Sequence, residues 1–548
     1  FTISEDGLFD SVTYIEFVED RASGLLSIPR RASFDGLIIE GNDNVLANGI
    51  TVAANNVIIR NVESSGALNL NEGARSFDAL NSVFGSLATN MPQPEAGNVI
   101  NLTNVDFTGN STINGGLFST SNVVFGGTLA VNDDVTLNDV ALAGKVTIAN
   151  DVTLTLGGTL VTGAAAETEV AGSGADSKLI VANNSKLESF SFIDNSNVEF
   201  AGNVTLEDVR LTSGAIYELS GNLVIEGNLL LGADAGTNSI TITGAGIISG
   251  GSIVSGGGAN ADTLILNAVT RVRGVSFSDN VTLDVDTDTI LEDVSGLATL
   301  DLGTTTTTAI GVLEVATLND TAANLKLQGA TLKGATVADA DVLDLGTGAT
   351  LEDVTFSAQN DELLIEGATV VLVGDIELSG AATNTFSISG AGTISGGSIV
   401  SGAAADTVKL TNVVRVRGVS FSDNVTLDVD TDTILEDVSG LATLDLGTTT
   451  TTAIGVLEIK QLNDEDAVLK LQGATLKGAT VADADVLDLG TGATLEDVTF
   501  SAQNDELLIE GATVVLVGDI ELSGAVANTF SISGAGTISG GSIVSGAA

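Results

Sequence analysis

Two short acidic runs are the clearest place in this sequence where side chains could do chemistry. Each run holds three aspartates spaced two residues apart, and the second run repeats the first 144 residues later. The six residues are Asp284, Asp286, Asp288, Asp428, Asp430 and Asp432. Side chains two residues apart on an extended strand point to the same side, so each run presents three carboxylates together.

Three chemical interpretations fit such a run. Clustered carboxylates are oxygen ligands for Ca²⁺, and a divalent ion would relieve their mutual repulsion. Paired carboxylates are also the catalytic groups of glycosidases. The third interpretation is a solvated outer face, with Leu283 and Val285 supplying the core between the aspartates. Because two near-identical runs argue against a single active site, we predict no catalytic residues and keep the six aspartates as candidate Ca²⁺ ligands.

Composition excludes several other kinds of site. The 548 residues include no Cys and no His, so zinc, haem and iron–sulfur centres and His-dependent nucleophiles are excluded. The chain carries 71 Asp and Glu against 19 Lys and Arg, a net charge of −52, which disfavours nucleic acid and anionic membranes as partners. It contains no apolar run of membrane-spanning length. With 43% hydrophobic residues, it still has enough apolar side chains for a packed core.

Internal repeats indicate the elements that must position these side chains. Residues 271–404 recur as 415–548, with eight differences in 134 aligned positions. Inside this long repeat, a shorter motif of the type Leu291-Glu-Asp-Val294 starts seven times in 144 residues, or roughly every 20.6 residues. Period-2 apolar runs bounded by Gly, Asn and Asp are typical of short strands. The sequence therefore predicts an all-β chain, a parallel β-solenoid with about 25 coils of about 20 residues.

The first coils carry a family resemblance. The segments 36–45 (GLIIEGNDNV) and 50–62 (ITVAANNVIIRNV) resemble the opening coils of right-handed parallel β-helices of the pectin-lyase-like type. The tandem coils that follow, to residue 548, are similar to the rods of large bacterial surface proteins: filamentous-haemagglutinin-like adhesins, autotransporter passengers and surface-layer proteins. The resemblance implies a right-handed solenoid; its motif describes packing rather than a particular activity.

Four segments follow from these patterns. Residues 1–34 lack the motif and are expected to form a short non-solenoid cap or a subunit contact. Residues 35–238 are diverged coils, 239–414 hold the first long repeat, and 415–548 hold the second, which ends in mid-repeat. Leu291 and Val294 are expected to point inward, stacked on Val272 and Val275.

The few basic residues are expected to fix the register between coils. The residue after each motif start is expected to form one column over successive coils: Arg273, Glu292, Glu314, Lys333 and Glu352. A carbohydrate-binding role is the alternative for the arginines Arg271, Arg273, Arg415 and Arg417.

Together these features predict a non-catalytic structural rod of the bacterial cell exterior, such as a surface-layer, stalk or filament subunit. Its expected partner is another copy stacked end to end, or further repeats of a longer chain. The alternative is an adhesin passenger that binds glycans or another cell surface.

Overall fold

The structure is a computed structural model of the chain. It describes residues 14–18, 20, 25–29, 33–42, 44–91, 99–163, 167–193, 197–232, 236–256, 261–278, 280–319, 324–338, 342–357, 361–367, 369–380, 382–463, 467–482, 486–501, 506–523 and 529–546. The chain divides into two compact units, formed by residues 1–283 and 284–548.

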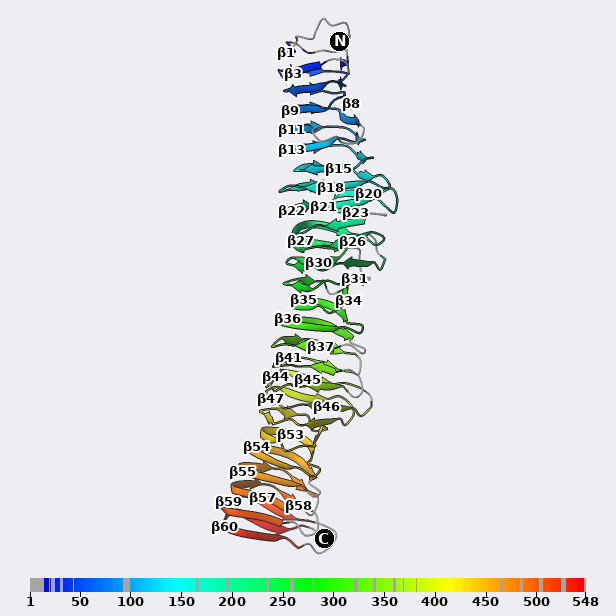
Figure 1. The fold of residues 1–548 in the computed structure, drawn as a ribbon. Helices are drawn as coiled ribbons and strands as arrows, with labels where there is room; N and C mark the ends of the chain where they lie inside the picture. Colours follow the sequence, from blue (N-terminus) through cyan, green and yellow to red (C-terminus); the bar gives the residue numbers. More distant parts are fainter. Residues whose placement is uncertain are drawn as a thin grey trace. The chain divides into compact units, whose positions relative to one another are not determined.

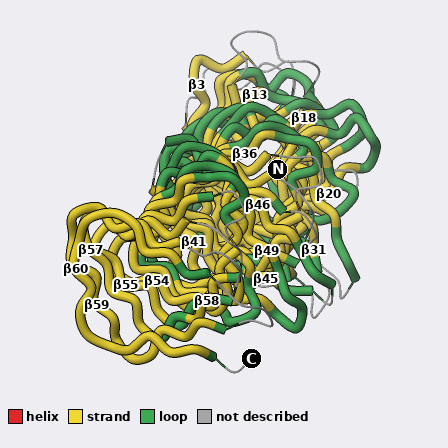
Figure 2. The backbone as a smooth tube through the Cα atoms, turned by 90° about the horizontal axis from the view of Figure 1, so that it is seen from below, coloured by secondary structure: helices red, strands yellow, loops and turns green. Residues whose placement is uncertain are grey.

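Both units are parallel β-solenoids. The described residues form 60 strands and no helix, as the ribbon and the tube show (Figures 1 and 2). The chain makes about 24 turns of about 19 residues each, close to the 25 coils of about 20 residues expected. The predicted all-β parallel solenoid is therefore confirmed. Within the described segments, no helix is long and apolar enough to span a membrane.

The core of the first unit consists of stacked columns of inward side chains. Strands β9 (Ser76–Phe84), β11 (Val99–Phe107) and β13 (Leu117–Phe125) pair in parallel. Their last residues, Phe84, Phe107 and Phe125, are fully buried, with ring centroids 6.0 and 5.2 Å apart along the column. Parallel pairing brings equivalent residues of successive coils into contact, so a motif that repeats along the chain forms a column in the core.

Part of the predicted cap belongs to the same ladder. Strand β1 (Tyr14–Glu16) pairs in parallel with β3 (Ser33–Glu40), and β2 (Leu26–Ile28) pairs with β5 (Ile50–Val52). Residues 1–13, 19, 21–24 and 30–32 of the predicted cap lie outside the described part of the chain.

In the second unit each turn contributes one strand to each of three ladders, called here faces 1, 2 and 3. Face 1 contains β37 (Asn324–Leu327), β40 (Val342–Asp344), β43 (Glu362–Leu364), β46 (Thr385–Ser389), β49 (Thr407–Thr411) and β52 (Thr426–Val429). Face 2 contains β38 (Thr331–Lys333), β41 (Ala349–Glu352), β44 (Thr369–Val373), β47 (Thr393–Ser395) and β50 (Arg415–Arg417). Face 3 contains β39 (Thr336–Val337), β42 (Thr355–Phe356), β45 (Asp375–Leu378), β48 (Ser398–Ser401) and β51 (Ser420–Phe421).

The long repeat does not close on a whole number of turns. Leu291, on β35 (Ile290–Asp301), pairs with Ala309 of β36 (Thr306–Asn319), which pairs in turn with β37 on face 1. When the ladder of face 1 is followed strand by strand from Leu291, β52 lies seven turns further along. Leu435, the counterpart of Leu291, follows β52 but pairs with Val416 on face 2. The 144-residue repeat therefore spans seven and one third turns.

This rotation corrects the predicted charge column. Glu292 pairs with Ile310 and not with Glu314. Glu314 begins a separate column on face 2, where it pairs with Lys333, and Lys333 pairs with Glu352. The Lys333 ammonium lies 3.1 Å from the Glu352 carboxylate. The predicted column is therefore confirmed from Glu314 to Glu352 but was wrong at the step from Glu292 to Glu314, because even spacing along the sequence does not tell which face a strand joins.

Candidate functional site

The structure places the six candidate aspartates around the ends of two equivalent strands. Asp284 lies on β34 (Val281–Val285), where Leu283 and Val285 are fully buried and Asp284 is partly exposed. Asp286 and Asp288 follow the strand and are exposed. Asp428 on β52 and the two aspartates after it repeat this arrangement. The predicted alternation, with aliphatic residues inward and carboxylates outward, is therefore what the structure has.

The third aspartate of each run binds the backbone of the next coil. The Thr306 N–H donates to Oδ1 of Asp288 at 2.8 Å, and the Thr450 N–H donates to Oδ1 of Asp432 at the same distance. Each of these carboxylates is thus committed to a contact between coils.

The first aspartate of each run is held in a setting that disfavours its charge. Burial, together with the neighbouring charges of Asp286 and Asp301, raises the pKa of Asp284. Burial also raises the pKa of Asp428, which pairs in register with Asp445 on the next coil. Like charges facing each other along a ladder destabilise it.

The second run has a cation that the first run lacks in sequence. The Lys409 ammonium lies 2.7 Å from Oδ2 of Asp430 and 3.4 Å from Oδ2 of Asp428. It therefore offsets part of the rise in the pKa of Asp428. In the first long repeat the corresponding residue is Ile265.

The carboxylates of each run do not converge on a common point. Within the described residues, no group of three or more acidic side chains lies close enough together to hold a metal ion. Asp432 bonds to the next coil, whereas Asp430 faces Lys409. Calcium binding by Asp284, Asp286, Asp288 and their counterparts stays a prediction.

Contacts of this kind between an aspartate and a neighbouring coil recur along both units. At least ten aspartate side chains accept a hydrogen bond from a backbone N–H one coil away. They are Asp134, Asp139, Asp208, Asp262, Asp288, Asp293, Asp353, Asp406, Asp432 and Asp437. A charged acceptor strengthens such a bond, worth about 1.5 kcal/mol or more where solvent is excluded. We call these ten residues the aspartate staples.

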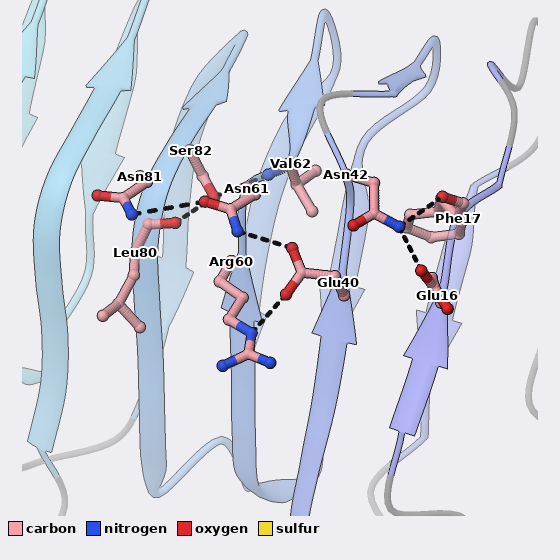
Figure 3. Close-up of polar contacts among 10 residues, drawn as sticks. All are labelled: Glu16, Phe17, Glu40, Asn42, Arg60, Asn61, Val62, Leu80, Asn81 and Ser82. Carbon is pink, nitrogen blue, oxygen red and sulfur yellow. Dashed lines mark hydrogen bonds and ion pairs between the residues drawn. The ribbon is translucent and has the colours of Figure 1, made fainter.

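The first coils contain an ion pair between a buried glutamate and a partly exposed arginine, which the sequence did not lead us to expect (Figure 3). Glu40, only 7% exposed, pairs in register with Arg60 of the next coil, with Oε2 2.5 Å from Arg60 Nε. Its Oε1 accepts a bond of 2.7 Å from Asn61 Nδ2. Burial raises the pKa of Glu40, but the bonds from Asn61 and Arg60 outweigh it and the net pKa is lowered. The opposite charges that end the two motifs Leu37-Ile-Ile-Glu40 and Val57-Ile-Ile-Arg60 could have predicted this pair.

From Asn61, a line of asparagines continues across the following coils of the first unit. Asn61, Asn81, Asn104 and Asn122 have positive φ angles between 47° and 54°. The side-chain amides of Asn81, Asn104 and Asn122 each donate to the asparagine one coil earlier, at 3.4, 3.0 and 2.9 Å, whereas that of Asn61 donates to Glu40. Asparagine tolerates this left-handed conformation better than most residues. The same asparagines therefore allow the chain to change direction and link successive coils.

Two of the four arginines considered for carbohydrate binding, those that begin the second repeat, form ion pairs. Arg415 Nη1 lies 3.0 Å from Oε2 of Glu436, and Arg417 Nε lies 3.4 Å from its Oε1. Glu436 is on the coil that follows β50, so both arginines contribute to the register of face 2.

No protein-family model matches this sequence, and a search among curated proteins also gives no match.

Proposed function

We propose that this chain is a non-catalytic structural rod of the bacterial cell exterior, a surface-layer, stalk or filament subunit that stacks end to end. The observation that carries the proposal is the set of aspartate staples. These residue types could serve catalysis or metal binding, but here they hold one coil to the next. Such a use of polar groups suits a protein whose task is to keep an extended ladder in register.

End-to-end stacking is supported by the way in which coils add to one another within the chain. Strand β60 (Ser531–Ser545) adds in parallel to β59 (Glu506–Leu522), as each coil adds to the one before it. An unpaired strand edge with apolar side chains favours the addition of another strand. Contact between different surfaces of two copies would propagate into a fibre.

Burial of the aromatic residues favours the structural role over the adhesin alternative. Glycan-binding platforms commonly expose aromatic rings, whereas every phenylalanine between residues 60 and 240 is buried here. Tyr217 is also buried, and its hydroxyl bonds to the backbone of Thr212. The absence of cysteine and the strongly acidic composition support an exterior location.

Electron microscopy and sedimentation of the purified chain test this proposal. We expect filaments or ordered arrays whose mass rises with protein concentration. A chain that stays monomeric at high concentration, and binds a glycan array instead, would refute stacking and favour the adhesin function.

A further inference from the structure

The line of asparagines in the first unit is continued by an aspartate. Asn122 and Asp139 directly precede Val123 and Val140, which pair in register, so Asp139 takes the next place in the line. Its φ angle of 49° lies within the range of 47° to 54° found for the four asparagines. The backbone therefore keeps its conformation through this step, and only the side chain changes from an amide to a carboxylate.

The hydrogen bonds along the line all run in one direction. The side-chain amides of Asn81, Asn104 and Asn122 each donate to the coil before, so each asparagine oxygen in the line accepts from the coil that follows. For Asn122 Oδ1 that donor would have to come from Asp139. An ionised carboxylate only accepts hydrogen bonds. Two acceptor groups therefore meet at this step, whereas each earlier step joins an N–H group to an oxygen.

The carboxylate of Asp139 is held in place by the coil on its other side. Its Oδ1 accepts from the Thr159 N–H at 2.7 Å and from the Thr159 hydroxyl at 3.0 Å. Within the described part of the chain, the hydrogen bonds to this side chain all go to Oδ1. One oxygen of the carboxylate thus serves as a staple, and Oδ2 is left for a ligand.

The contact between the two coils is also open at this step. The Val123 N–H donates to the Asp139 carbonyl at 3.4 Å, which is longer than the usual range of about 2.7–3.2 Å for such bonds. A hollow of about 370 Å³ lies at the same place. Its lining combines the amide and the carboxylate with three hydroxyl groups: Asn122, Asp139, Ser121, Thr159 and Thr162.

We propose that this hollow binds a hard divalent cation, Ca²⁺, between Asn122 Oδ1 and Asp139 Oδ2. Carboxylate, amide and water oxygens are ligands that Ca²⁺ takes, and the hollow has room for the water molecules that complete its coordination. The net charge of −52 favours a cation over other ligands. The site is separate from the two acidic runs, and it goes beyond the structural role because it makes the join between two particular coils depend on an ion.

The variant Asp139→Asn tests the site because it repairs the line. Asparagine keeps an oxygen for Thr159 and supplies the missing N–H donor to Asn122, as asparagine does on the coils before. The variant should therefore fold, melt at a higher temperature than the native chain in chelator, and lose the response to Ca²⁺. The matched control is Asp134→Asn, which removes the same charge from the same coil at a staple outside the line.

Hydrogen exchange of residues 117–142 in the full chain measures the response at the site itself. The exchange is followed as Ca²⁺ is added at constant ionic strength, which NaCl maintains. With Ca²⁺ at about ten times its Kd, exchange should slow about tenfold in the native chain and in Asp134→Asn, because an ion that binds only the closed contact protects it in proportion to its occupancy. Exchange in Asp139→Asn should not change.

Three results would overturn the proposal. The first is equal slowing of exchange in the native chain and in Asp139→Asn, which would place the ion elsewhere. The second is no slowing at about 10 mM Ca²⁺, well above the Kd of weak calcium sites in extracellular modules. The third is loss of the response in Asp134→Asn as well, which would mean that the charge of the coil, rather than the break in the line, attracts the ion.

Discussion

The two acidic runs share one sequence but differ in their charged surroundings. Lys409 contacts Asp428 and Asp430 of the second run, whereas Ile265 is the residue at the corresponding position before the first run. Lys460, where the first repeat has Ala316, likewise lies 2.9 Å from Asp423. Lys409, on the coil just before the second repeat, and Lys460, inside it, thus each contact an aspartate of that repeat. The comparison indicates that the outer surface of the repeats diverges by adjusting charge while the core is kept.

The largest expected effect tests the claim that the two cores are equivalent. Val294→Asp and Val438→Asp each bury a carboxylate at a fully buried position, so each should lower the free energy of unfolding by about 3–5 kcal/mol. Chemical denaturation monitored by circular dichroism measures the change. The control is Val312→Asp, at a valine that is 43% exposed, which should change stability by less than about 0.5 kcal/mol. Unequal losses of unfolding free energy in the two variants would show that the two cores are not equivalent.

A smaller effect tests the aspartate staples. Asp288→Ala and Asp432→Ala each leave a backbone N–H of the next coil without its acceptor, which should cost about 1 kcal/mol in either repeat. Asn keeps an oxygen at the same position, so Asp288→Asn and Asp432→Asn should restore most of the loss. If Asn is as damaging as Ala in thermal melts, charge rather than the hydrogen bond is what matters.

The third prediction concerns the pH dependence of stability that arises from Asp284 and from Asp428, the second of which lies beside Lys409. The folded pKa of Asp284 lies above its ordinary value of 3.8, so the stability it contributes is full below pH 3.8 and is lost as pH rises through the folded pKa. At neutral pH, Asp284→Asn should therefore raise stability, by about 0.5 kcal/mol after solvent screening. Asp428→Asn should raise it less, because Lys409 already offsets part of the cost. Urea denaturation at neutral and acidic pH checks both variants, and a larger gain at acidic pH would contradict the assignment.

Removing Lys409 sharpens the same comparison. Lys409→Ile places beside the second run the same residue type that Ile265 provides before the first run. In this background, Asp428→Asn should raise the stability of the chain as much as Asp284→Asn does. An unchanged gain would mean that Lys409 does not act on Asp428.

The smallest expected effect is that of calcium. Ca²⁺ near its Kd should stabilise the chain by about 0.4 kcal/mol, and a chelator should remove that gain in a thermal melt. The first run should respond more, because no lysine occupies the corresponding position in its sequence. Asp284→Asn should then abolish more of the response than Asp428→Asn. Identical melts in chelator and in millimolar Ca²⁺ contradict calcium binding by either run.

The sequence was sufficient for the coil but not for the assignment of strands to faces. Leu291 and Val294 are buried as expected, because period-2 alternation decides which side of a strand faces the core. The alignment of Glu292 with Glu314 failed because strands on the three faces share one apolar pattern, and only the register of the strand pairs distinguishes them. The Glu40–Arg60 pair was missed because each residue was considered within its own coil.

The fractional turn of the long repeat has a consequence for how such a chain can grow. Counterparts one repeat apart lie on neighbouring faces, and three repeats of seven and one third turns would make 22 whole turns before a residue type returns to its face. A gene duplication therefore need not begin and end at the same angular position, since any face accepts the aliphatic row of any other. A mutation in one repeat and the same mutation in the next would point in directions a third of a revolution apart. Repetition in this sequence is therefore also a means of distributing one surface feature around an axis.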